Sequence, residues 1–184
     1  QTPLDQARLN ATFTAIAGHL FYNSDWIPDL PPERLEILKR TMPSHDLKPR
    51  PVDLFEAEPA RLWLLTDTRS AVRRDVVALY NWDQHKPTAL TCAANRLGLP
   101  AAQEYVAFDF WANRFVPPFG EMLTAQLPAA SCRVLAVRPM ADHPQLLSTS
   151  RHVTQGLLDV TEEKWDAAAG TLSGTSRVVA NDSY

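Results

Sequence analysis

Proline limits what this chain can fold into more than any other residue, since 15 prolines stand against only 6 glycines in 184 residues. Proline fixes its own φ and lacks a backbone donor, so it is suited to the ends and edges of strands. Prolines flank short apolar runs at Pro87, Pro100, Pro117-Pro118, Pro128 and Pro139. This punctuation favours many short strands over a helix bundle.

Short apolar runs from about residue 50 onward predict the strands themselves. They occupy residues 61–66, 75–82, 88–92, 105–111, 121–127 and 131–137, with a short helical turn at 95–98. A terminal hairpin is predicted from 157–166 and 171–179, because the loop between them ends in Gly170, which tolerates positive φ. Short strands broken by proline and glycine predict an antiparallel β-sandwich.

The first 45 residues have a different pattern, which predicts a helix, a strand and a second helix. Leu9, Phe13 and Ile16 recur at helical spacing, and Gly18 is suited to the end of that helix. Residues 19–22 form a short apolar run, which predicts a buried strand.

The second helix is indicated by its two ends. Pro31 and Pro32 suit a first turn, Lys39 and Arg40 suit a last turn, and Pro43 prevents its continuation. A helix–strand–helix unit of this length closes no core of its own. We therefore expect it to need a partner sheet, and its apolar helix faces to pack against the sandwich.

Composition argues against two classes of partner. The net charge is −3 with scattered basic residues, which disfavours nucleic acid and anionic membranes. No apolar run approaches the roughly 20 residues that span a bilayer. We expect neither nucleic acid nor membrane as a partner, and no cofactor.

Cysteine and histidine give no metal or redox motif. Cys92 and Cys132 have no such spacing, and the sequence favours free buried thiols over a single disulfide. The remaining candidate ligands lie near predicted turns, where histidines are expected to be exposed or locally bonded. They are His45, His85, His143 and His152.

Tryptophan allows two interpretations. Trp63, Trp82 and Trp111 fall in or beside predicted strands, where such rings usually belong to the core. The alternative is a carbohydrate-binding platform of exposed, coplanar rings. The exposure of the tryptophans distinguishes the two.

One stretch near the N-terminus resembles the end of a melibiase-type (β/α)8 barrel. Residues 18–25 read Gly-His-Leu-Phe-Tyr-Asn-Ser-Asp, which resembles the eighth strand of that barrel and its polar end. Residues 30–38, with Pro-Pro-Glu-Arg, resemble the eighth helix, which in that family leads into a C-terminal β-sandwich.

Three later segments resemble strands of that sandwich. They are Val76-Val77-Ala78-Leu79-Tyr80-Asn81-Trp82, Tyr105-Val106-Ala107-Phe108-Asp109-Phe110-Trp111 and 131–139. Each motif is weak alone, and their order and spacing make the resemblance more specific. The implied fold is mainly β: an antiparallel β-sandwich at 49–184, preceded at 1–48 by an α-β-α remnant of a (β/α)8 barrel.

The resemblance implies the C-terminal part of a retaining α-galactosidase-type glycoside hydrolase that acts on α-linked sugars. Such enzymes use two carboxylates, which in this family stand at the ends of the fourth and sixth barrel strands. No segment of 1–184 matches those motifs, so we assign no catalytic residue. The parent is expected to be an O-glycosyl hydrolase and this chain alone inactive. Its expected partners are the missing barrel of the same polypeptide and, in the full-length protein, a carbohydrate.

The resemblance also places four residues at the active-site end of the eighth strand. Asn23, Ser24, Asp25 and Trp26 would contact substrate there, Asp25 through a sugar hydroxyl and Trp26 by stacking. The alternative, which we favour, is that Asp25 bonds backbone donors of its loop and Trp26 packs on the following helix.

Three functions follow from these patterns. The first is a non-catalytic sandwich that stabilises the barrel, and the second is a carbohydrate-binding module with surface aromatics. The third, which we rate lowest, is an enzyme that pairs Asp25 with another carboxylate such as Asp109. An exposed barrel remnant would also favour self-association as a homo-oligomer.

Overall fold

The computed structural model describes residues 2–20, 22, 24, 26–69, 72–100 and 103–182. Two helices come first, α1 (Leu4–Ile16) and α2 (Pro32–Thr41), with the short 3-10 helix η1 (Ile27–Asp29) between them. The strands that follow are β1 (Arg50–Pro51), β2 (Leu62–Asp67), β3 (Arg74–Asn81), β4 (Thr88–Ala93), β5 (Tyr105–Asp109), β6 (Arg114–Phe119), β7 (Met122–Leu127), β8 (Ser131–Pro139), β9 (Val160–Asp166) and β10 (Thr171–Ser176). A 3-10 helix, η2 (Ala94–Leu97), follows β4.

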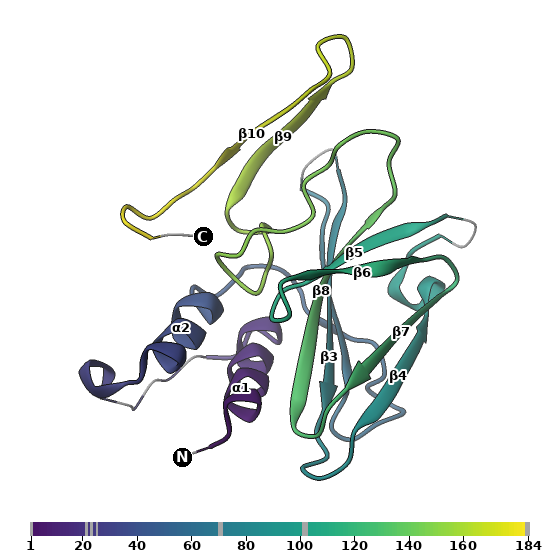
Figure 1. The fold of residues 1–184 in the computed structure, drawn as a ribbon. Coiled ribbons are helices and arrows are strands. Elements are labelled where there is room, and N and C mark those ends of the chain that lie inside the picture. Colours follow the sequence, from purple (N-terminus) through teal and green to yellow (C-terminus); the bar gives the residue numbers. More distant parts are fainter. Residues whose placement is uncertain are drawn as a thin grey trace.

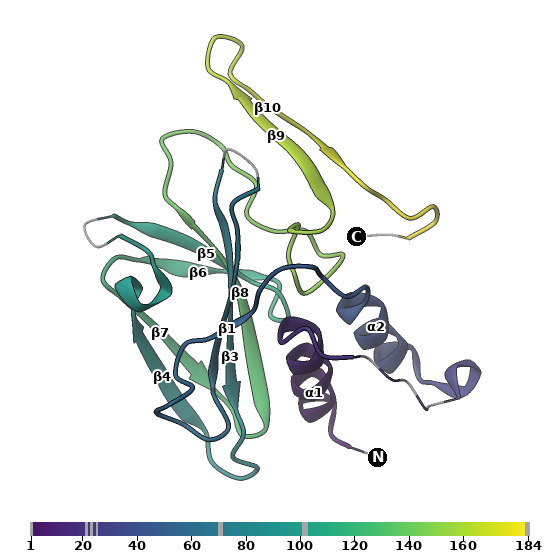
Figure 2. The ribbon, with the colours of Figure 1, turned by 180° about the vertical axis from the view of Figure 1, so that it is seen from behind.

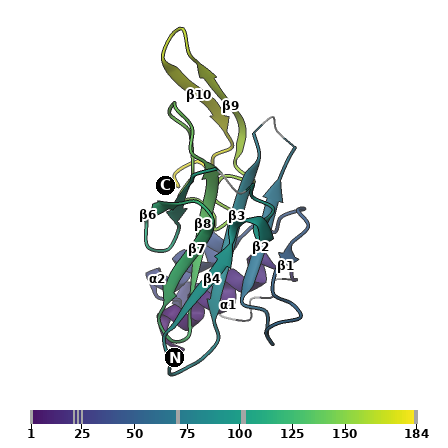
Figure 3. The same cartoon turned by 90° about the vertical axis from the view of Figure 1, so that its right-hand side faces the viewer.

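Within the described ranges, six strands form one antiparallel sheet in the order β1-β2-β3-β8-β5-β6. Strands β4 and β7 pair as a second, smaller sheet, which lies to the right of the main sheet in Figure 1 and in front of it in Figure 3. Helices α1 and α2 lie on the opposite side of the main sheet, as the rear view also shows (Figure 2). The predicted mainly β, antiparallel sandwich with helices before it is confirmed.

Strand β3 lies in the middle of the main sheet and faces two cores. Val77 and Leu79 point to the β4–β7 layer, where they join Cys92 and Leu123 in one apolar cluster. The alternating residues Val76, Ala78 and Tyr80 point to the helix side and belong to a second cluster. A strand with two buried faces needs a continuous apolar run, which is why 75–82 stands out in the sequence.

Helix α1 covers the second core through its apolar stripe. Leu9 and Ile16 are buried against Leu65 and Val76 of the main sheet, so the expected packing of the helix on the sandwich is confirmed. Gly18 ends the helix at φ +69°, as predicted.

Three of the five tryptophans pack against this helix-side core. The ring of Phe13 meets Trp63, Tyr80 and Trp82 edge-on, at centroid distances of 5.5, 5.6 and 5.1 Å. Trp111 donates its Nε1–H to Thr12 Oγ1 of α1 at 2.9 Å. The core interpretation of these three tryptophans is therefore confirmed.

The strand predicted at 19–22 is absent from its described residues. His19, Leu20 and Tyr22 lie in no strand, and Leu20 and Tyr22 are 75% and 85% exposed; Phe21 lies outside the described residues. A strand forms only where a neighbour satisfies its backbone groups, and none of the described strands pairs with this segment.

Two strands were missed by the sequence analysis, both at sheet edges. Strand β6 contains Pro117-Pro118, which an edge strand tolerates because one of its sides needs no ladder bonds. Strand β1 is only two residues long and includes Pro51.

The two cysteines are free thiols on different sides of the main sheet. Cys92 lies in the β4–β7 core, whereas Cys132 packs against the helix-side core. Burial raises the pKa of Cys132 to about 12, so this thiol stays protonated at neutral pH.

The segment that precedes β9 holds helix α2. Arg40 is buried; it donates Nη1–H to the Arg151 carbonyl, and its own carbonyl accepts the Val153 N–H at 2.8 Å. His152 lies between them in sequence and is also buried, with Nε2 3.4 Å from Asp159. The expectation of an exposed or locally bonded histidine is wrong here, because this segment packs against α2.

One glutamate holds the β9–β10 hairpin on the sandwich. Glu163 of β9 accepts hydrogen bonds from Arg74 at 2.6 Å, from Arg138 at 2.8 Å and from the Leu146 N–H at 3.0 Å. Although burial opposes its ionisation, the Leu146 N–H and the two guanidinium groups lower the pKa of Glu163 below its ordinary 4.5.

We expect Ile16→Ala to lower the free energy of unfolding by about 2 to 5 kcal/mol, because it opens a cavity under α1. Ile27→Ala, at a half-exposed position of η1, serves as the control and should change it by less than about 0.5 kcal/mol. Urea unfolding followed by fluorescence measures both. Equal, small effects would mean that α1 does not fold as one unit with the sandwich.

Acid should weaken the hairpin anchor. A glutamate whose folded-state pKa is depressed contributes stability above its unfolded pKa of about 4.5, and this is lost as the pH falls through the folded value. Unfolding free energy measured between pH 7 and pH 3 should therefore drop in the wild type. Glu163→Gln should cost about 3 to 5 kcal/mol at pH 7 and flatten part of that drop. An unchanged pH profile would contradict the assignment.

Candidate functional site

The four predicted contact residues fall between α1 and α2. Asn23 and Asp25 lie outside the described residues, so their predicted contacts remain predictions. Ser24 is exposed, and Trp26, 72% exposed, precedes η1, where its carbonyl accepts the Asp29 N–H at 3.1 Å. The favoured alternative, in which Trp26 packs on the following helix, is wrong, since most of the ring faces solvent. Figure 1 shows η1 at the end of the molecule farthest from the sheets.

Large apolar side chains gather in this segment. Leu20, Tyr22, Trp26 and Ile27, here called the exposed apolar segment, are at least half exposed within eight residues of sequence. Single exposed apolar residues are ordinary, but several close together are typical of a surface that contacts another part of a protein or a partner. The sequence signal for these residues was the apolar run at 19–22, which we interpreted as a buried strand in need of a partner sheet.

Asp109, the carboxylate suggested as a partner of Asp25, has a structural role. Asp109 is buried at the end of β5; one of its oxygens accepts Arg133 Nε–H at 2.6 Å and the other the Ala112 N–H at 3.3 Å. Both oxygens are therefore used in fixing the β5–β6 turn and β8. A carboxylate held in this way has no free oxygen to attack or protonate a substrate.

A groove of about 660 Å³ runs between α1 and the main sheet beside this ion pair. Trp111 lines it, but its ring carries the Arg8 guanidinium at 5.3 Å from the centroid. That cation occupies a face on which a sugar would otherwise stack. The exposed aromatic ring of the groove is Phe115, on the edge strand β6.

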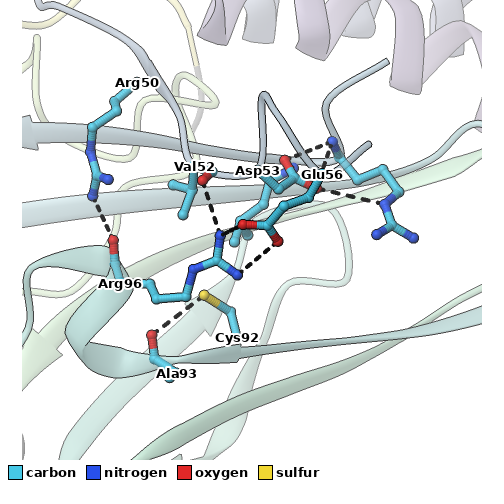
Figure 4. Close-up of polar contacts among 9 residues, drawn as sticks. Arg50, Val52, Asp53, Glu56, Cys92, Ala93 and Arg96 are labelled. Carbon is cyan, nitrogen blue, oxygen red and sulfur yellow. Dashed lines mark hydrogen bonds and ion pairs between the residues drawn. The ribbon is translucent and has the colours of Figure 1, made fainter. Parts of the chain in front are cut away.

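The loop between β1 and β2 is fixed by a set of polar contacts (Figure 4). Asp53 accepts the Arg61 and Leu62 N–H groups at 3.0 and 2.9 Å. Arg96 forms a two-point ion pair with Glu56 and donates to the Val52 carbonyl at 3.2 Å.

This loop displays Phe55, which is 98% exposed. Cys92, drawn below Arg96 in Figure 4, donates its S–H to the Ala93 carbonyl at 3.4 Å. Burial raises the pKa of Cys92, although the nearby Arg96 opposes the shift. A protonated, buried thiol is a structural residue rather than a nucleophile.

Metal ligands are not assembled in the part of the chain that the structure describes, where no group of three or more His, Cys, Asp or Glu side chains converges. No helix in the described ranges is both long and apolar enough to cross a membrane.

Trp26 should be the tryptophan most accessible to a quencher. We expect Trp26→Phe to remove most of the acrylamide-quenchable fluorescence. The rings of Trp63, Trp82 and Trp111 are packed in or beside the helix-side core, and Trp165 of β9 is partly buried and stacked on His143. Trp82→Phe is the matched control and should leave the quenchable part intact. Strong quenching that survives in Trp26→Phe would mean that Trp26 is covered in solution.

Comparison with known families matches residues 65–137 to the alpha galactosidase C-terminal beta sandwich domain. These residues run from β2 through β8 and include both sheets of the sandwich. No curated protein matches the chain in sequence.

Solved structures share the fold at low sequence identity. A GH27 β-L-arabinopyranosidase from Geobacillus stearothermophilus has a TM-score of 0.60 at 16% identity, over 78% of this chain and 32% of that chain. Alpha-galactosidase I from Mortierella vinacea has a TM-score of 0.53 at 12% identity, over 74% and 36%. The α-galactosidase of Saccharomyces cerevisiae, solved with raffinose, has a TM-score of 0.55 at 12% identity, over 76% and 44%. The chain thus spans less than half the length of each.

Proposed function

We propose that this chain, whose residues 65–137 match the alpha galactosidase C-terminal beta sandwich domain, is the C-terminal part of a retaining glycoside hydrolase of the α-galactosidase type that acts on α-linked sugars. In this proposal residues 1–48 complete a (β/α)8 barrel with their helix–strand–helix unit. Residues 49–184 form the sandwich and its terminal hairpin, which stabilise that barrel.

The observation that carries the proposal is the exposed apolar segment. Leu20 and Tyr22 belong to a run with strand-like sequence, yet they lie in no described sheet and are among the most exposed apolar side chains. A barrel would supply strands on both sides of such a run and bury its side chains in the layer between strands and helices. Helices α1 and α2 would keep their places in that arrangement, because α1 packs on the sandwich and α2 on the segment before β9.

The chemistry of the whole enzyme would lie outside this chain. Retaining hydrolysis needs a nucleophilic carboxylate and an acid–base carboxylate about 5 Å apart, at the carboxyl ends of barrel strands. Residues 23–26 would stand at the same end of the eighth strand. There Asp25 would accept a hydrogen bond from a sugar hydroxyl, and the exposed Trp26 would offer a ring for stacking.

A carbohydrate-binding module is the weaker candidate. Such a module needs exposed aromatic rings, whereas Trp63, Trp82 and Trp111 pack against α1. Their packing against α1 supports a stabilising role for the sandwich, because these rings hold the first helix on the main sheet.

The test is to extend the reading frame upstream of Gln1 and assay both proteins. The extended protein should hydrolyse an aryl α-galactoside with retention of configuration, and the 184-residue chain should not. In the extended protein, Trp26→Ala should lower kcat/KM by about tenfold or more, whereas Phe55→Ala, which removes an exposed ring elsewhere, should not. An upstream frame without alternating strands and helices, or activity of the short chain alone, would contradict the proposal.

A further inference from the structure

The β9–β10 hairpin stands apart from the rest of the molecule. It extends beyond the sandwich in all three views (Figures 1, 2 and 3), and its residues lie outside the segment that matches the sandwich family. Strand β10 pairs with β9 on one side, and none of the described strands pairs with its other side. A two-stranded ribbon is only marginally stable in water, so the open edge of β10 invites another strand.

The open edge also lacks the features that keep edge strands apart. Residues 171–176 read Thr-Leu-Ser-Gly-Thr-Ser, with no charge and no proline, and all but Leu172 are exposed. Natural edges are usually protected by lysine, proline or inward-pointing charges. Edge strand β6 of this same chain carries Arg114 and Pro117-Pro118, so the two edges differ in this respect.

We propose that β10 pairs with β10 of a second copy of this chain, antiparallel about a two-fold axis at Ser173, to form a four-stranded sheet. An uncharged strand pairs with itself without like charges meeting across the axis, whereas β9 carries Glu162, Glu163, Lys164 and Asp166. The projection of the hairpin keeps the two sandwiches apart. The anchor at Glu163 fixes the hairpin to the sandwich, so that the edge is presented in one orientation.

This pairing is independent of the proposed hydrolase function and lies on a different part of the molecule from the exposed apolar segment. To separate the two surfaces, all measurements use a Trp26→Ser, Ile27→Ser background, which removes apolar side chains from that segment. Sedimentation velocity from about 10 µM to about 1 mM then reports the monomer–dimer equilibrium in the affinity range expected for a short strand pair. The background protein should dimerise reversibly.

A charge at Ser173 tests the strand and the two-fold axis together. Ser173→Glu faces Lys164 across the hairpin, so β9–β10 keeps its fold, but two glutamates meet at the axis. We expect the dimer to weaken by about tenfold or more. Ser173→Lys should do the same, and an equimolar mixture of the two variants should dimerise again, because opposite charges then face each other.

The control is Thr91→Glu, at an exposed threonine of the smaller sheet, which should leave the dimer unchanged. A monomer at every concentration, a dimer that survives Ser173→Glu, or a mixture that fails to recover dimerisation would each overturn the proposal.

Discussion

Strand β3 is buried on both faces, and each face belongs to a different core. One face closes the sandwich against β4 and β7, while the other receives α1. A mutation in β3 therefore affects one core or the other, according to the face on which the side chain lies. The alternation of these side chains fixes the register of β2 and β8 on either side. The apolar residues of α1 share one core with β3 and its neighbours β2 and β8, so the helix and the main sheet depend on the same contacts.

Helix α2 and the β9–β10 hairpin are held in place mainly by polar contacts rather than by the two apolar cores. Arg40 ties α2 to the segment before β9, and Glu163 ties β9 to β3 and β8 through two arginines. The side chains of Glu163, Arg74 and Arg138 are all largely buried, so loss of Glu163 would leave two guanidinium groups without their carboxylate. These contacts fix where α2 and the hairpin lie. The exposed apolar segment leads into α2, and the hairpin carries the open edge of β10.

The two open surfaces differ in chemistry and suit different partners. The exposed apolar segment offers large side chains, which a barrel of the same polypeptide would bury. Strand β10 offers an open edge with small polar side chains, to which another strand can pair. Both proposals give the chain contacts that it does not make alone. The chain covers less than half the length of each of the solved structures that share its fold.

Local sequence determined the elements that depend on periodicity and end signals: α1 and α2, the alternating strands of the sandwich, and the terminal hairpin. It did not reveal the edge strands β1 and β6, because proline at an edge is tolerated only where one side is unpaired. It also read 19–22 as buried and His152 as exposed or locally bonded. An apolar run shows that a segment tends to be covered, whereas the neighbours that would cover it come from distant sequence. Only the tertiary structure decided which strands form edges and which of these residues are buried, because burial depends on contacts with residues that are distant in the sequence.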